Sequence, residues 1–167
     1  NTTSSSYYPY FYNRNYSLYA NSGTNFLYGY RSSSTSTSTS YADTTLIITP
    51  EIQGLDSATK QLEFYARTTS AGRPGEVIIG LTDAAGTPSS LTIVDTVYAT
   101  ATAYNKYTIY LDGATTGDAR IAFMLRREIG VFDYICIDDV SVTDIPPCPE
   151  PIGLGLTSAT QTTATIS

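Results

Sequence analysis

Tyr134-Ile135-Cys136-Ile137-Asp138-Asp139-Val140-Ser141-Val142 is the stretch of this 167-residue sequence that decides the fold. Its β-branched and aromatic side chains are typical of a buried strand, but two adjacent carboxylates stand where a core strand carries apolar residues. Successive side chains of a strand point to opposite faces, so Asp138 and Asp139 are expected on opposite sides of a sheet. The same alternation puts Cys136, Val140 and Val142 beside Asp138, and Ile135, Ile137 and Ser141 beside Asp139.

One of the two carboxylates is therefore expected to point inward, where it needs a partner. The sequence holds only nine Lys plus Arg and no His, so few side chains could neutralise that charge. Calcium suits the position, because hard cations take carboxylate and carbonyl oxygens as ligands. The alternative is a carboxylate that accepts backbone N–H bonds at a strand end. Both interpretations stay open.

Short strands separated by turn signals fill the sequence from residue 44 onward. Turns are indicated at 71–75, 83–86 and 112–113, and no stretch keeps a helical period. This spacing predicts an all-β fold, a two-sheet antiparallel β-sandwich of jelly-roll type that occupies residues 1–144. The expected strands are 46–49, 61–67, 76–82, 91–98, 107–111, 120–126 and 134–142. The expected core residues are Leu46, Ile48, Leu62, Phe64, Val77, Ile79, Ile93, Ile109, Ile121, Phe123, Ile137, Val140 and Val142.

Tyrosine is concentrated at the start of the chain, where residues 1–31 hold eight of the 15 tyrosines. Phe26, Tyr28 and Tyr30 alternate as one face of a half-buried strand should, and 21–24 is a turn signal that joins this strand to an earlier one. Packing explains such tyrosines. A surplus remains at Tyr7, Tyr8, Tyr10 and Tyr12, and these are the candidate ligand-binding residues, because tyrosine offers a sugar a flat apolar face with a polar tip.

Composition excludes several functions. The formal net charge is -6, and no basic run exceeds the pair Arg126 and Arg127, which argues against a nucleic-acid partner. No apolar run approaches the ~20 residues of a membrane-spanning helix. Charged residues make up only 14%, a composition common in secreted β proteins. The start Asn1-Thr2-Thr3 indicates an excerpt of a longer precursor.

Catalysis is not expected. Without His there is no Ser-His or Cys-His pair and no His-based zinc site. Asp138 and Asp139, on opposite faces of one strand, cannot flank a glycosidic bond at the ~5–9.5 Å that glycosidase carboxylates use. Cys136 is expected to be a small buried residue and not to pair with Cys148.

After Asp144 the composition changes. Residues 145–151 form a proline-rich linker, and 152–167 resemble the start of a fibronectin type III module. Two such strands alone are expected to be disordered or to pair with a sheet edge. The Ser/Thr tract 32–40 is expected to be a surface loop.

Three motifs together resemble a known family. Ile137-Asp138-Asp139-Val140, Leu46-Ile47-Ile48-Thr49-Pro50 and the strand 62–67 are similar to strands of the gingipain-type cleaved adhesin and choice-of-anchor J domains, which are MAM-like jelly rolls of bacterial surface proteins. The resemblance covers about residues 16–143. It implies an extracellular, non-catalytic adhesion or carbohydrate-binding domain whose partner is a glycan or a host or neighbouring surface protein.

The resemblance also implies one structural calcium ion. An Asp of the 138–139 pair would bind it, together with backbone carbonyls around Asn21, Ser22 and Gly23 and an acidic side chain from the first strand. The Phe-Glu pair that the family carries near its start is not visible in this sequence. The competing hypothesis for function is a passive spacer between modules, which the proline linker and the trailing fibronectin-like segment favour.

Overall fold

The computed structural model describes residues 9–31, 44–126, 132–147, 156–159 and 164–166. Tyr7, Tyr8, Cys148 and the Ser/Thr tract lie outside these residues. Within them the elements are strands, apart from two 3-10 turns at Leu55–Ser57 and Pro88–Ser90. No helix in the described part of the chain is long and apolar enough to cross a membrane.

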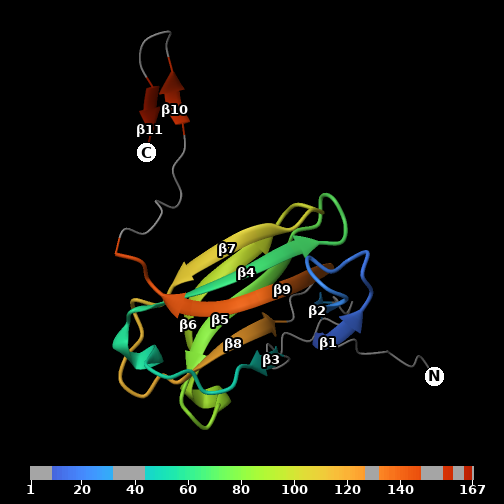
Figure 1. The fold of residues 1–167 in the computed structure, drawn as a ribbon. Coiled ribbons are helices and arrows are strands. Elements are labelled where there is room, and N and C mark those ends of the chain that lie inside the picture. Colours follow the sequence, from blue (N-terminus) through green and yellow to red (C-terminus); the bar gives the residue numbers. More distant parts are fainter. Residues whose placement is uncertain (1–8, 32–43, 127–131, 148–155, 160–163, 167) are drawn as a thin grey trace, which may run out of the picture.

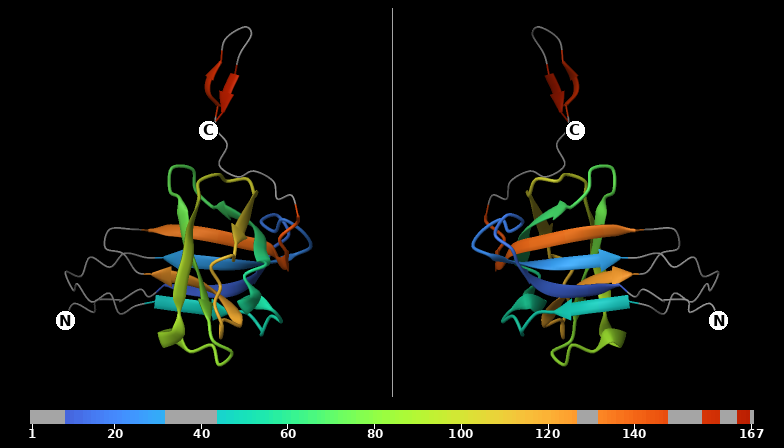
Figure 2. Two further views of the ribbon diagram at one scale, coloured as in Figure 1. Left: turned by 90° about the vertical axis from the view of Figure 1, so that its left-hand side faces the viewer. Right: turned by 90° about the vertical axis from the view of Figure 1, so that its right-hand side faces the viewer.

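Two antiparallel sheets face each other and form the predicted jelly-roll sandwich (Figure 1). The five-stranded sheet has the order β1-β2-β9-β4-β7, with β1 Tyr10–Asn15, β2 Asn25–Arg31, β9 Asp133–Asp144, β4 Lys60–Thr68 and β7 Asn105–Tyr110. The four-stranded sheet has the order β3-β8-β5-β6, with β3 Thr44–Ile48, β8 Arg120–Arg126, β5 Gly75–Thr82 and β6 Thr92–Ala99. Figure 2 shows both sheets from two further sides. The strands predicted from residue 44 to residue 142 are confirmed to within a few residues at each end.

The core lies between the sheets, where the inward side chains of each strand alternate as predicted. The five-stranded sheet contributes Leu62, Phe64 and Ala66 from β4 and Ile135 and Ile137 from β9, and the four-stranded sheet contributes Val77, Ile79 and Leu81 from β5 and Ile121, Phe123 and Leu125 from β8. The Phe64 and Phe123 rings meet edge to face, with centroids 5.6 Å apart. Side chains of both sheets thus fill one apolar layer.

Four of the predicted core positions are wrong. Ile93 is 53% exposed and Val140 is 44% exposed. Leu46 and Ile48 are only half-buried, and they lie opposite Met124 and Ala122 on the face of β8 that points away from the core.

Bulges explain the first two errors. Between Glu63 and Tyr65, a single β4 residue lies opposite two residues of β9, because Glu63 pairs with Ser141 and Tyr65 with Asp138. A similar shift adds one residue to β6 between the partners of Ile79 and Gly80, so Val94 packs on the core in place of Ile93. An extra residue reverses the alternation of faces beyond it. The extra residue on β9 coincides with Asp139, whose φ is 50°.

A buried group of three charges joins the two sheets. The Arg31 guanidinium on β2 donates to the Glu76 carboxylate on β5 at 2.7 Å, and it also pairs with the Asp133 carboxylate on β9. The Asp133 contact includes Arg31 Nε, 3.1 Å from both carboxylate oxygens. All three residues are buried. Burial of a charge is tolerated when it is paired and hydrogen-bonded in this way.

The strands β10, Leu156–Ala159, and β11, Ala164–Ile166, form a sheet of their own. They pair with each other in antiparallel register, with Leu156 opposite Ile166. The expectation that this tail is disordered or joins another sheet edge is therefore wrong for these seven residues, because each strand finds its partner in the other. The domain boundaries at 144 and 151 and the likeness to a fibronectin type III module stay predictions.

Candidate functional site

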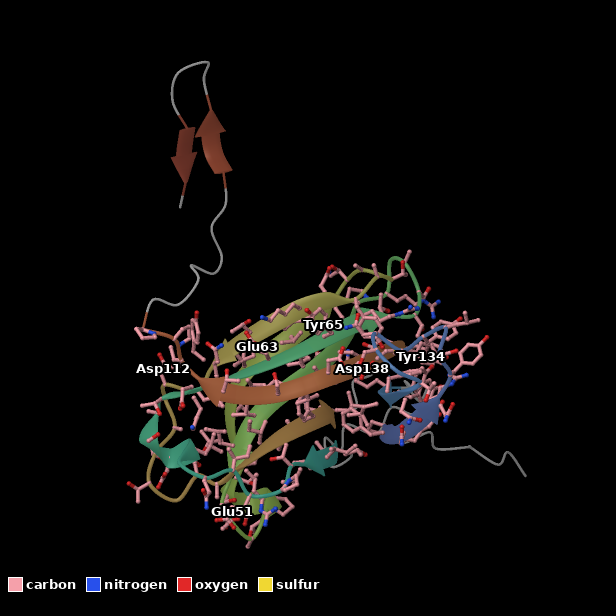
Figure 3. All side chains as sticks on the ribbon, viewed as in Figure 1. Glu51, Glu63, Tyr65, Asp112, Tyr134 and Asp138 are labelled. Atoms are coloured by element: carbon pink, nitrogen blue, oxygen red, sulfur yellow. The ribbon has the colours of Figure 1, made fainter. Side chains whose placement is uncertain are left out.

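Aromatic side chains gather on the outer face of the five-stranded sheet, the face that points away from the core. Register brings them into rows across the strands. Tyr10, Tyr30 and Tyr134 lie opposite one another on β1, β2 and β9, and the next row is Tyr12, Tyr28 and Cys136. We call the set Tyr10, Tyr12, Phe26, Tyr28, Tyr30, Phe132 and Tyr134 the aromatic face. Figure 3 labels Tyr134 and Asp138 on β9 and Tyr65 and Glu63 on β4, the strands on which this face continues.

The rings of the aromatic face touch one another. Ring centroids are 5.0 Å apart for Tyr10 and Tyr30, for Tyr12 and Tyr28, and for Tyr30 and Tyr134. Phe132 meets Tyr134 edge to face at 5.3 Å. Such separations lie in the favourable range for aromatic pairs, so the rings hold one another in place before any ligand arrives.

Exposure divides the aromatic face into a floor and a rim. Phe26 and Tyr28 are 3% and 8% exposed and form a second apolar cluster with Cys136, while Tyr10 and Tyr12 are 44% and 38% exposed. The interpretation of Phe26 and Tyr28 as packing residues is confirmed, although they pack outside the main core. Burial raises the pKa of the Tyr28 and Tyr10 hydroxyls, so both keep their protons at neutral pH. The exposed rim is where a ligand can stack.

Three arginines lie over these rings and their neighbours. The Arg14 guanidinium is 5.2 Å from the Tyr28 ring centroid, and that of Arg73 is 5.5 Å from the Phe132 centroid. Arg67 of β4 lies opposite Cys136 of β9, and its guanidinium is 4.8 Å from the Tyr19 ring centroid. Each guanidinium thus lies within cation–π distance of an aromatic ring, and Arg67 Nε also donates to the Thr68 carbonyl oxygen at 3.3 Å.

A pocket of about 150 Å³ opens between Arg14 and the loop that joins β1 to β2. Its lining residues are Arg14, Tyr19, Phe26, Tyr28, Thr69 and Cys136. Cys136 is fully buried and carries a free thiol, as the sequence predicted. Burial raises the pKa of this thiol to about 11, even though Arg67 and Arg14 act in the opposite direction. The thiol is therefore protonated at neutral pH and serves as part of the pocket floor.

The β1–β2 loop is tied to the two carboxylates of β9. Asp138 Oδ2 accepts the backbone N–H groups of Asn21 at 2.8 Å and Ser22 at 3.2 Å. Asp139 accepts the Asn21 side-chain amide at 2.7 Å and the Ser22 hydroxyl at 2.5 Å. These last two hydrogen bonds hold the pKa of Asp139 below its usual value. Gly23 follows in the same turn with a φ of 58°.

Four of the predicted calcium ligands are thus brought together, but neither carboxylate points into the core. Asp138 is half-buried on the outer face, and Asp139 is exposed at the bulge. The expectation of an inward carboxylate is wrong for two reasons. The bulge interrupts the alternation of faces, and the β1–β2 loop covers the outer face at this point and donates hydrogen bonds to both carboxylates.

The residues fit a calcium ion only in part. Asp139 together with the side-chain oxygens of Asn21 and Ser22 could hold one, whereas the two backbone N–H groups at Asp138 Oδ2 are donors and cannot bind a cation. Strand β1, Tyr-Phe-Tyr-Asn-Arg-Asn, supplies no acidic side chain. No group of three His, Cys, Asp or Glu side chains suited to a metal occurs among the residues described. Calcium stays a prediction.

Of the predicted ligand-binding residues, Tyr10 and Tyr12 lie on the rim of the aromatic face, and Tyr7 and Tyr8 lie outside the described residues. Sequence reasoning missed Arg14, Arg67 and Tyr134. Arg14 could have been found, because it continues the alternation of Tyr10 and Tyr12 along one strand. Arg67 and Tyr134 required knowledge of which strands are neighbours.

No protein-family model and no curated protein matches the chain. Solved structures do. The K2 cleaved adhesin domain of Lys-gingipain is similar with a TM-score of 0.58 and 12% identity over 80% of this chain and 81% of that one. The K1 cleaved adhesin domain of Lys-gingipain from Porphyromonas gingivalis W83 has a TM-score of 0.59 and 15% identity over 80% and 83%. The family 30 carbohydrate-binding module of a Clostridium thermocellum cellulosomal cellulase has a TM-score of 0.52 and 10% identity over 79% and 82%. The chain therefore has the jelly-roll fold of cleaved adhesin domains and carbohydrate-binding modules.

Proposed function

We propose that this chain is a non-catalytic carbohydrate-binding module of an extracellular protein, and that the aromatic face is its binding surface. One observation carries the proposal: the exposed rings of Tyr10 and Tyr12, with centroids 5.7 Å apart, rest on the inner rings of Tyr30 and Tyr28 at 5.0 Å and form a platform with Arg14 at its margin. Sugars present apolar C–H faces and polar edges, and a tyrosine platform offers the matching surfaces. The names of the similar solved structures, an adhesin domain and a carbohydrate-binding module, agree with this assignment.

Five carboxylates between the sheets and on the five-stranded sheet are already held by other side chains or by backbone N–H groups, which supports binding without catalysis on this sheet. Glu76 and Asp133 are buried on Arg31, Glu63 pairs with Lys106 at 2.7 Å, and Asp138 and Asp139 are tied to the β1–β2 loop. A glycosidase needs two carboxyl groups that face one bond, one of them ready to give a proton.

The second candidate is a passive spacer that separates modules of a surface protein. The proline-rich segment 145–151 and the separate β10–β11 pair favour it. A spacer needs no exposed aromatic platform, and such a platform costs solubility when nothing covers it. The platform is therefore the feature that separates the two candidates.

A glycan array followed by affinity electrophoresis tests the proposal. We expect the intact chain to bind at least one polysaccharide, and Tyr12→Ala to weaken that binding about fivefold, since a ring contact contributes about 1 kcal/mol. Tyr98→Ala is the matched control, because Tyr98 is 55% exposed on β6 of the other sheet. No binding to any glycan, or equal loss in both variants, would favour the spacer.

A further inference from the structure

The positive charges of this acidic chain are unevenly distributed. In the described part, Arg31 pairs with Glu76 and Asp133, Lys60 with Asp144 at 2.6 Å, and Lys106 with Glu63 at 2.7 Å. Five described arginines make no ion pair with a described carboxylate: Arg120 and Arg126 of β8, on the other sheet, and Arg14, Arg67 and Arg73, each of which lies over an aromatic ring on the side of the aromatic face. Three uncompensated cations thus lie on one face of a chain whose formal net charge is -6.

Of these arginines, Arg14 lines the pocket, and Arg67 lies on the strand beyond Cys136. Arg14 extends from β1 over Tyr28, and Arg67 extends from β4 directly opposite Cys136. Cys136 lies on β9 between them and forms the pocket floor. The Arg67 guanidinium is 4.8 Å from the ring centroid of Tyr19, which lines the pocket. An acidic group that enters the pocket would therefore meet the Arg14 guanidinium in its lining and have that of Arg67 close by, beside Tyr19.

The negative charges of the same face lie at one end of it. Asp138 and Asp139 lie beside the β1–β2 loop, and their oxygens already accept hydrogen bonds from Asn21 and Ser22. Arg73, by contrast, lies over Phe132 at the beginning of β9. Asp138 follows Cys136 by two residues on the same face of β9, so it borders the pocket at this end. An acidic chain would therefore extend from the pocket away from Asp138, along the tyrosine rows toward Arg73.

We propose that the ligand of the aromatic face is an acidic polysaccharide, one of whose uronate rings enters the Cys136 pocket with its carboxylate between Arg14 and Arg67. The inference deepens the proposed carbohydrate binding and rests on it. Guanidinium groups bind carboxylates with paired, charge-assisted hydrogen bonds, while the exposed rings of Tyr10 and Tyr12 stack on neighbouring sugars. The pocket of about 150 Å³ is roughly half the lower limit for a drug-sized ligand, which suits a single sugar ring.

The test compares each acidic polysaccharide with its own neutral derivative. Polygalacturonate, alginate and hyaluronate are titrated into the full chain by calorimetry, beside the same polymers after methyl esterification of their carboxylates. We expect at least one acidic polymer to bind, its ester to bind roughly tenfold to a hundredfold more weakly, and added salt to weaken the acidic form alone.

Variants locate the effect. Arg14→Gln and Arg67→Gln should each weaken binding of the acidic form about tenfold or more and leave the weak binding of the ester unchanged. Arg14→Lys keeps the positive charge but loses the paired N–H donors of the guanidinium. Its affinity for the acidic form should therefore lie between that of the unchanged chain and that of Arg14→Gln. Arg126→Gln removes the same charge from an exposed position on β8 of the other sheet and is the control. Melting temperatures near that of the unchanged chain show that each variant folds.

Three outcomes would overturn the inference. Equal binding of acid and ester would leave the proposed carbohydrate binding standing but show that the arginines do not select a carboxylate. The same conclusion would follow if neutral glycans bind and none of the three acidic polymers does. If no glycan of either kind binds, the inference fails together with the proposed function.

Discussion

Asp139 shows how one residue can serve both backbone and surface. Its φ of 50° lies in the left-handed region, which Asp and Asn tolerate better than most residues with a Cβ. Its carboxylate accepts hydrogen bonds from the Asn21 amide and the Ser22 hydroxyl, so the bulge presents an anion to the β1–β2 loop. The same residue therefore interrupts strand β9 and holds the β1–β2 loop, whose Tyr19 lines the pocket.

Acid should loosen this attachment. Hydrogen bonds depress the folded-state pKa of Asp139, so the stability that they contribute is present above the unfolded pKa of about 3.9 and is lost as the pH falls through the folded value. We expect Asp139→Asn, which keeps the tolerance for a positive φ, to cost less than about 1 kcal/mol at pH 7 because the site is exposed. Denaturant unfolding from pH 7 to pH 2 should show a smaller acid-induced loss in this variant. Identical pH profiles would contradict the attachment.

Calcium is tested at the same two residues. An ion that binds only the folded state stabilises it, so we expect calcium to raise the melting temperature and a chelator to lower it. Because the backbone N–H groups of Asn21 and Ser22 already occupy Asp138, Asp139→Asn should reduce the calcium response more than Asp138→Asn. A transition that neither calcium nor chelator moves would leave the carboxylates as hydrogen-bond acceptors and end the calcium prediction.

The elements most sensitive to backbone spacing are β5 and β9, which approach each other at the ends that hold Gly75 and Tyr134. A Cβ at Gly75 would lie 2.3 Å from the Tyr134 carbonyl oxygen, a backbone atom that cannot turn aside. We expect Gly75→Ala to destabilise the chain by about 1–3 kcal/mol, the usual cost of overpacking. Gly113→Ala is the control, since a Cβ there meets nothing within 4 Å. Equal effects in chemical denaturation would contradict the close approach.

At this scale the sequence predicts where strands occur better than which way their side chains point. Alternation located β4, where apolar and polar residues change places regularly, whereas β5 and β8 are apolar at nearly every inner position and stand out as short apolar runs between turns. Alternation failed for Ile93 and Val140 because each is next to the extra residue of a β-bulge. A single sequence contains no signal for such an extra residue. Alternation failed for Leu46 and Ile48 because an apolar edge strand shows no preferred face.

The candidate site could be predicted only in part for a related reason. Tyr10 and Tyr12 share a strand, so their common face follows from spacing alone. Arg67 joins them only because β9 lies between β2 and β4, and that strand order is not encoded in any local pattern. The loop from 21 to 24 was expected near Asp138 and Asp139 from the family resemblance. The donors it presents there, N–H and O–H groups, depend on the backbone path of the turn.

For the molecule as a whole, the buried charges at Arg31 join the sheets. Arg31→Met should destabilise the chain by about 3–5 kcal/mol, because it leaves the Glu76 and Asp133 carboxylates buried without their cation. The triple variant Arg31→Met, Glu76→Gln, Asp133→Asn should recover part of that loss, since it removes the charges together. Urea unfolding measures both. A single variant as stable as the unchanged chain would show that the charged group does not hold the sheets.

The tail should be separable from the sandwich. We expect deletion of the residues after Pro147 to leave the melting temperature nearly unchanged, because β10 and β11 pair only with each other in the described sheets. Differential scanning calorimetry of the full and shortened chains makes the comparison. A large fall would show that the domain extends beyond residue 144.

The central place of β9 has a consequence for how the protein is made. β9 is the last strand of the sandwich to be synthesised, yet it lies between β2 and β4. Until residues 133–144 have left the ribosome, β2 and β4 each have an edge without the partner that β9 provides, and the aromatic face lacks Tyr134 and Cys136. Pairings this distant along the chain form slowly, because a long loop must close before they gain contacts. The five-stranded sheet can therefore close only after β9 has become available, whatever the order in which its other strands pair.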